Sequence, residues 1–457
     1  MFRVGHADEI LPRRGITHLV EHLALHPQDR RATDFNGYVD LTTTVFHCEA
    51  DTLAAVGDFL TSVSRTLVQL PFDRMDKEAQ VLRAEAAQRR GSAIGTSLWL
   101  RYGPTAFGTL EYEEMFLHRP SQQLMRAHLQ RYFTRQNAAI VLSGPPPATL
   151  DLTALPAGAR VTVPISLPVE QRFPAWTTAN GNAVTFTCLL PRTPAVPATM
   201  FVISSVLRHL LREELAISYD VSTGSHVLSS THAHHALRAD CRLADAAEVA
   251  AHMQTELSRI IYEGCPPEEL AEYQRERRRS ESLPGSSMGV AGYLANEWLY
   301  GNESVDIDAL DDEADRLTIA DVQDVAQAIH DTAMWLVPDS APISDRRVHL
   351  VTQWSTWAVN GTQYHQAPPQ RNDDYLVAAY DGLSLAVIDR GWISISFDRI
   401  AACKQWSDGG RTLYGRDGFT LTVDPAEWID GEQIVALIDR QVPKEFVIVA
   451  ADRLRGR

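Results

Sequence analysis

Two histidines and a glutamate in one short segment carry the clearest chemical signal in this sequence. Residues 15–26 read GITHLVEHLALH, which places His18 and His22 four residues apart with Glu21 directly before the second histidine. On a helix, residues four apart share one face, so the two imidazoles could bind one metal ion. Glu21 would project beside that ion, where a carboxylate can take a proton from water. This His-x-x-Glu-His order is known from metallopeptidases.

The motif needs a third ligand, and the helical run FDRMDKEAQVLRAEAAQRR at 72–90 supplies two candidates. Glu78 and Glu85 are seven residues apart, so both fall on one helix face after two turns. Two histidines and one carboxylate hold zinc and keep a fourth position for water, although manganese or cobalt could also bind such a set. Taken alone, the histidines could instead be solvated surface residues, and the glutamates could be solvated charges on a polar helix.

With these residues in this order, the sequence resembles the insulinase, or pitrilysin, family of zinc metallopeptidases, in a short bacterial processing-peptidase-like form. The resemblance covers about residues 1–338. It implies that Glu85 is the third zinc ligand and that Glu78 is a second carboxylate that orients Glu85 or a histidine. It also matches Asn36, in FNGYVDLTTT, to an asparagine on an edge strand, where we expect it to bind substrate.

A second element carries the same resemblance. LLREELAISYDV at 210–221 is similar to the family's Arg-x6-Tyr element, which here is Arg212 and Tyr219. The resemblance implies that both residues reach a zinc site on a facing domain. Arg212 would hold substrate carbonyl or carboxylate groups, and Tyr219 would donate a hydrogen bond to the oxyanion of the transition state. The alternative is an ordinary helix-to-strand junction with an exposed arginine and a packed tyrosine.

The first domain is shorter than the resemblance implies. Seventeen residues precede His18, and His22 and Glu85 are 63 positions apart. We therefore expect the first strand of its sheet to be absent, while the ligands are retained.

Hydrophobic spacing outlines the elements that must position these residues, and it repeats. A strand, an amphipathic helix, a proline break and a second helix occur twice, and each half closes with a helix and a short apolar strand. The repeated strand and first helix are 42–50 with 51–69, and 234–243 with 245–263; the closing strands are 139–142 and 333–337. We predict an α+β fold of two homologous α/β-roll units, each an antiparallel sheet plus helices, at 1–160 and 170–338.

Residues 345–457 predict a small β-rich C-terminal domain of unknown role. The segments LSLAVID, GWISISF, RTLYG and FTLTVD alternate as strands do, and DGEQIVALIDR at 430–440 predicts a helix. Proline-rich stretches near 155–174 and 337–346 are typical of the linkers between domains.

Composition excludes several classes of function. The net charge of −16 argues against a broad nucleic-acid surface. The sequence has no run of 18 apolar residues and no signal-peptide pattern, so we expect neither membrane insertion nor export. We therefore expect a cytoplasmic location. The five cysteines are scattered without a CxxC pair, which favours reduced thiols.

These observations predict a zinc-dependent metalloendopeptidase that cleaves peptides or small unfolded proteins inside an enclosed chamber, with peptide maturation as one possible setting. One chain carries both the zinc motif and the Arg–Tyr element, so we expect a homodimer, the alternative being a heterodimer with a related subunit. Two other functions stay open. The chain could be a catalytically inactive scaffold or partner subunit of the same family, or its C-terminal domain could recruit a partner or substrate.

Overall fold

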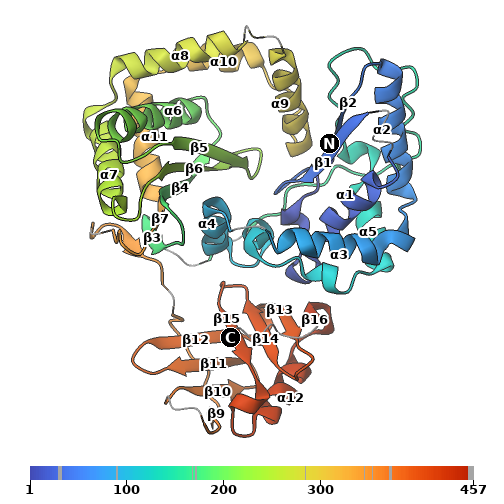
Figure 1. The fold of residues 1–457 in the computed structure, drawn as a ribbon, viewed down its shortest axis with the longest axis vertical. Helices are drawn as coiled ribbons and strands as arrows, with labels where there is room; N and C mark the ends of the chain where they lie inside the picture. The colour runs from blue at the N-terminus through green and yellow to red at the C-terminus, as the bar shows by residue number, and fades with distance from the viewer. Residues whose placement is uncertain are drawn as a thin grey trace. The chain divides into compact units, whose positions relative to one another are not determined.

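In the computed structural model the chain folds into two compact units (Figure 1). Unit 1 comprises Met1–Ala138, Pro146–Glu170 and Thr352–Arg457, and unit 2 comprises Ala139–Pro145 and Gln171–Val351. The structure describes residues 1–28, 33–88, 91–166, 168–169, 172–281, 283, 285–343, 345–352, 354–369 and 373–450. The C-terminal segment thus belongs to the same compact unit as the His-x-x-Glu-His motif. The three domain boundaries expected from the sequence stay a prediction.

The N-terminal part of unit 1 is mostly helical. Its described helices and strands are α1 Ile16–Leu25, β1 Asp34–Val39, β2 Thr44–Glu49, α2 Leu53–Val68, α3 Met75–Ala86, α4 Ala93–Tyr102 and α5 Gln122–Tyr132, with short 3-10 turns that include η2 Leu11–Arg13 and η5 Met115–His118. Strands β1 and β2 form an antiparallel ladder. Leu19, Val20 and Leu23 of α1 are fully buried among the apolar side chains of this part. The buried face fixes the rotation of α1 about its axis.

One strand expected from the sequence does not form. Residues 139–142 have no strand structure, and Phe2 forms isolated antiparallel bridges with Ala138 and with Thr44. After Gly5 the chain leaves the extended conformation and forms the 3-10 helix His6–Asp8, so the pairing of Phe2 with Ala138 stays an isolated bridge.

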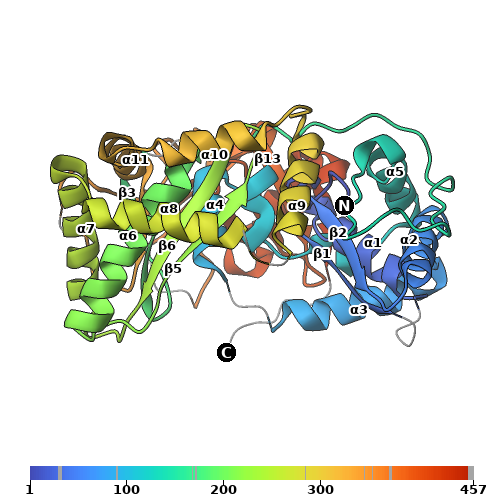
Figure 2. The ribbon, with the colours of Figure 1, turned by 90° about the horizontal axis from the view of Figure 1, so that it is seen from above.

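Unit 2 packs helices on a sheet. Its described elements are β3 Ala175–Thr178, β4 Ala183–Pro191, α6 Ala195–Arg208, the π-helix η7 His209–Glu214, β5 Val221–Val227, β6 His232–Asp240, α7 Ala246–Glu263, α8 Pro267–Glu281, α9 Ser286–Tyr300, α10 Ile307–Asp315, α11 Ile319–Thr332, β7 Met334–Val337 and β8 His349–Leu350. Among the described residues the strand order is β5-β6-β4-β7-β3-β8. Alternate residues of β4, from Val184 to Leu190, enter the core, and α6, α7 and α11 cover that face (Figure 2).

The C-terminal segment of unit 1 is built from two small sheets and one helix (Figure 1). Over its described residues, one sheet has the order β12-β11-β10-β9 and the other β15-β14-β13-β16. The bounds are β9 Thr362–His365, β10 Tyr375–Ala379, β11 Gly382–Val387, β12 Gly391–Ser396, β13 Ile400–Gln405, β14 Arg411–Gly415, β15 Thr420–Val423, α12 Gly431–Gln441 and β16 Val447–Val449. Residues from both sheets and from α12 share one apolar core.

The α+β class predicted from the sequence is confirmed, including the β-rich C-terminal segment. The sheets are not purely antiparallel, because β3 runs parallel to β7 and β8, and β13 runs parallel to β16. None of the five cysteines, all in described positions, forms a disulfide. Within the described part of the chain, no helix is both long enough and apolar enough to cross a bilayer.

Candidate metal-binding active site

Helix α1 carries the motif, and its N-terminus is held by a buried carboxylate. Glu9 accepts hydrogen bonds from the backbone N–H groups of Gly15, at 3.0 Å, and Thr17, at 2.8 Å. This carboxylate satisfies helix donors that would otherwise be unpaired, and its charge suits the positive end of the helix dipole. Burial alone would raise the pKa of Glu9, but its contacts with His6 and Arg14 outweigh burial and lower the pKa to about 2. The start of α1 is therefore fixed.

The predicted ligands lie together on facing helices. His18 and His22 of α1 and Glu85 of α3 each offer a ligand atom, and these atoms all lie within 4.8 Å of one another. His22 Nε2 is 3.9 Å from Glu85 Oε2. A tetrahedral zinc ion with bonds of about 2 Å separates its ligand atoms by roughly 3.3 Å, so a small closure of these side chains would complete the site. The donor set and its spacing fit a zinc ion.

A carboxylate lies behind each histidine. Glu114 Oε1 is 3.0 Å from His18 Nδ1, and Glu78 Oε2 is 3.5 Å from His22 Nδ1. Carboxylates in this position hold the ring hydrogen on Nδ1, so that Nε2 carries the lone pair that binds a metal. Burial and the nearby His18 charge also lower the pKa of His22, which favours the neutral, metal-binding imidazole.

Glu114 is a functional candidate that sequence reasoning missed. It lies 96 residues after His18, in an irregular stretch just before η5, and no periodic pattern connects the two. Its local sequence, EEMFLH, offered one weak signal, namely a glutamate against an apolar run. Glu114 is 4% exposed, and a buried carboxylate requires a partner. Here His18 and the nearby Arg14 guanidinium supply it.

Glu21 lies beside the ligands and is buried against strand β1. Its carboxylate Oε2 is 3.8 Å from His22 Nε2. Burial raises the pKa of Glu21 to about 7; the nearby His18 charge opposes this rise, and the Glu85 carboxylate adds to it. On the other side, a Cβ atom at Gly37 of β1 would lie 2.5 Å from Glu21 Oε1. The carboxylate thus occupies space that a glycine leaves open.

Asn36 precedes Gly37 on β1 and is exposed. In the β1–β2 ladder it is paired with His47. The structure therefore places it on the same strand that borders Glu21. Its proposed contact with substrate stays a prediction.

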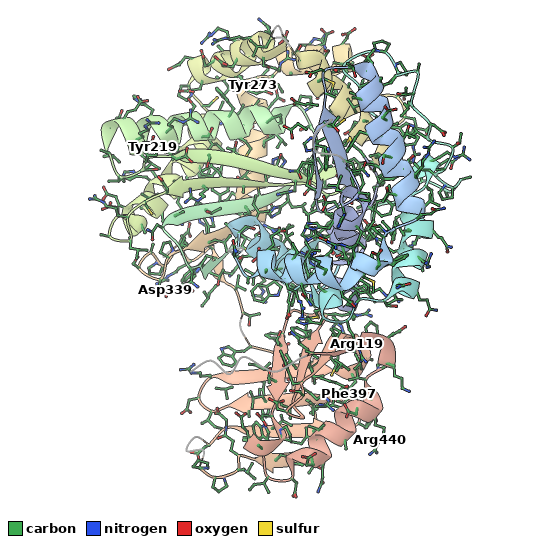
Figure 3. The ribbon with its side chains drawn as sticks, turned by 45° about the vertical axis from the view of Figure 1, so that its right-hand side comes forward. Arg119, Tyr219, Tyr273, Asp339, Phe397 and Arg440 are labelled. Atoms are coloured by element: carbon green, nitrogen blue, oxygen red, sulfur yellow. The ribbon has the colours of Figure 1, made fainter. Side chains whose placement is uncertain are left out.

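Arg212 and Tyr219 lie together in unit 2. The Arg212 guanidinium carbon is 5.0 Å from the centre of the Tyr219 ring, and Tyr219 is 76% exposed at the surface of the unit (Figure 3). Arg212 belongs to the π-helix η7, a distortion that is frequent at functional sites. Asp240 Oδ1 accepts hydrogen bonds from Ser218 Oγ and from the N–H groups of Tyr219 and Asp220. Asp240 therefore fixes the backbone that presents Tyr219.

Comparison with known proteins identifies the fold. No model of a known protein family and no curated protein matches the sequence. Among solved structures, a protease from Helicobacter pylori is 16% identical with a TM-score of 0.60, and a peptidase M16 inactive domain from Pseudomonas fluorescens is 15% identical with a TM-score of 0.59. Each match covers 75% of this chain and 92% of the other. Pitrilysin is 15% identical with a TM-score of 0.50, over 74% of this chain and 42% of its own. The chain has the fold of the M16, or pitrilysin, peptidases.

Proposed function

We propose that this chain is a zinc-dependent endopeptidase that cleaves peptides or small unfolded proteins. The observation that carries the proposal is the convergence of His18, His22 and Glu85, with the buried carboxylate of Glu21 beside them. Burying the charged carboxylate of Glu21 costs free energy. Packing between the two helices alone does not explain that cost, whereas a role beside a metal ion does.

His18, His22 and Glu85 would hold the metal. When bound, zinc supplies a Lewis acid that acidifies water and polarises a peptide carbonyl. Glu114 and Glu78 hold the two imidazoles in the orientation that this role requires. The donor set favours zinc, and manganese or cobalt could bind the same donors.

Glu21 would move the proton. A buried carboxylate whose pKa lies near neutrality can accept a proton from water and then release it to the leaving amine. Because Glu21 is buried, little bulk water reaches its carboxylate. The same residue thus serves as base and then as acid within one turnover.

The remaining predicted residues would bind substrate. We propose that Tyr219 donates a hydrogen bond to the developing oxyanion, that Arg212 holds substrate carbonyl or carboxylate groups, and that Asn36 binds the substrate backbone at the edge of β1. An enclosed chamber, a role in peptide maturation and a cytoplasmic location belong to the same proposal. Because one chain carries both the zinc motif and the Arg–Tyr element, we propose a homodimer with two equivalent sites; a heterodimer with a related subunit is the alternative.

The second candidate function is a non-catalytic subunit. One matched structure is described as an inactive M16 domain, so the fold is compatible with loss of activity. The complete donor set and the buried Glu21 favour the enzyme.

The test is the substitution Glu21→Gln, with Glu49→Gln on the exposed side of β2 as its matched control. Both variants and the unchanged protein are loaded with zinc and incubated with a mixture of unstructured peptides, and the products are measured by mass spectrometry. We expect Glu21→Gln to bind zinc normally and to lose cleavage by roughly 10²-fold or more. Retained cleavage in this variant would remove Glu21 from the mechanism, and no cleavage by the unchanged, zinc-loaded protein would contradict the peptidase proposal.

A further inference from the structure

Two adjacent glutamates in unit 1 have partners in different parts of the chain. Glu114 pairs with His18 of the metal site. Glu113 pairs with His118 and, 291 positions along the chain, with Lys404 of strand β13. One short stretch of backbone is therefore held at both ends, by the metal site on one side and by the C-terminal β domain on the other.

The Lys404–Glu113 pair is a built contact and not a chance surface ion pair. The Lys404 side chain is 3% exposed, and a lysine buried to that extent needs a partner. Its ammonium also lies 4.4 Å from the centre of the Trp406 ring. Burial alone would raise the pKa of Glu113, but the hydrogen bonds from His118 and Lys404 lower it to about 2. Glu113 is therefore fully charged at neutral pH.

An apolar cluster joins the same two parts of the chain. It consists of side chains from the N-terminal part and from β13 and β16 that form one buried cluster: Leu11, Met115, Ala401, Ala402 and Ile448. Tyr112 and Tyr414 pack against the cluster with their rings edge to face, 5.9 Å apart. The residues on either side of Glu113 and Glu114 are thus packed against the C-terminal domain.

The same stretch is coupled directly to α1. The N–H of Phe116 donates to the carbonyl of Arg14 at 3.0 Å. A Cβ atom at Gly15 would lie 2.7 Å from Glu114 Cβ, so the backbone before α1 approaches Glu114 closely. Residues 112–114 have no regular secondary structure, and η5 is a single 3-10 turn. Their position therefore depends on these tertiary contacts.

We propose that the C-terminal β domain is an intramolecular clamp that positions Glu114 against His18, with Lys404 as the positioning residue through Glu113. The proposal rests on the zinc site proposed above. It assigns the domain a role in setting metal affinity, instead of recruitment of a partner. Loss of the clamp lets residues 112–118 move, and His18 then loses the carboxylate that orients its ring.

The test makes two single substitutions in the 457-residue chain. Lys404→Met keeps the apolar part of the side chain, and Glu113→Gln changes a half-exposed side chain, so the fold should tolerate it. Lys444→Met, an exposed lysine of the same domain, is the control. Zinc affinity is measured by competition with a chromophoric chelator, and hydrogen exchange is measured over residues 112–118. We expect both variants to bind zinc about 10- to 100-fold more weakly and to exchange faster in this segment, while the control is unchanged.

A double substitution separates positioning from general destabilisation. If Lys404 acts through Glu114, Lys404→Met should cause little further loss of zinc affinity in a chain that already carries Glu114→Gln. Unchanged zinc affinity in the single variants, or fully additive losses in the double variant, would overturn the clamp. If the unchanged protein takes up no zinc, the proposed function is wrong, whereas unchanged exchange over 112–118 in the variants contradicts the clamp itself.

Discussion

Gly37 of strand β1 offers a sharp test of the position assigned to Glu21. A Cβ atom at this position would lie 2.5 Å from Glu21 Oε1 and 3.0 Å from Leu25 Cδ1. Both atoms are the outer ends of flexible side chains, so Gly37→Ala should displace side chains and leave the backbone in place. The substitution therefore perturbs the carboxylate without touching a metal ligand.

The size of the effect follows from that distance. Ordinary contact requires about 3.5 Å, so the Glu21 carboxylate must move by about 1 Å. A misplacement of about 1 Å in a catalytic group costs about 10²-fold in rate, or about 2.7 kcal/mol in activation free energy. The change in the free energy of unfolding should stay within about 1 kcal/mol, because the strand propensity scale spans about that much and the atoms that a Cβ would meet belong to flexible side chains.

The assay compares kcat on a cleaved peptide, zinc content and thermal unfolding. Gly289→Ala in α9 is the control, because a Cβ atom there meets nothing within 4 Å. Gly37→Ala should lose about 10²-fold in kcat with zinc content unchanged, and it should add almost nothing to the loss caused by Glu21→Gln. Two results would refute the placement of Glu21. One is full activity of Gly37→Ala, and the other is a loss of kcat in the double variant that equals the product of the two single losses.

Three further predictions concern the surroundings of the site. Glu78→Gln should weaken zinc binding about 10- to 100-fold, because His22 loses its orienting carboxylate; unchanged affinity in a chelator competition would contradict this. Asp240→Ala should lower kcat about tenfold or more without changing zinc affinity, because Tyr219 loses its fixed backbone, and an unaltered kcat would show that Asp240 does not position Tyr219 for catalysis. Burial lowers the pKa of His128 from 6.5 to about 4, so protonation favours the unfolded chain and stability is lost as the pH falls between these values, by up to about 3 kcal/mol. Denaturant titrations of the zinc-free protein from pH 7 to pH 4 should show a smaller fall in the His128→Gln variant; identical pH dependence would exclude His128 as the cause.

The parts of the fold that were predictable are those with a local signal. The helices at 53–68, 75–86 and 246–263 follow amphipathic spacing, and the strands of the C-terminal domain alternate in hydrophobicity. Helical spacing placed His18 and His22 on one face and offered Glu78 and Glu85 as third ligands, and the resemblance to the pitrilysin family implied Glu85, whose ligand atom lies near those of the two histidines.

The parts that were missed depend on contacts between distant residues. Glu114 meets His18 across 96 residues through an irregular stretch, and Lys404 meets Glu113 across 291. Neither spacing leaves a periodic trace in the sequence. The prediction of a strand at 139–142 was wrong for a related reason, because strand formation depends on pairing with distant residues, and the apolar composition of a segment does not show that pairing.

Metal content per chain tests the central claim most directly. The protein is purified without a chelator or a histidine tag, and zinc is measured by elemental analysis beside a His18→Ala variant. We predict about one zinc per chain in the unchanged protein and a strongly reduced content in the variant, since each protein ligand contributes to the site. A folded protein that contains no metal and takes up no added zinc would contradict the account, and the non-catalytic subunit would then be the better description.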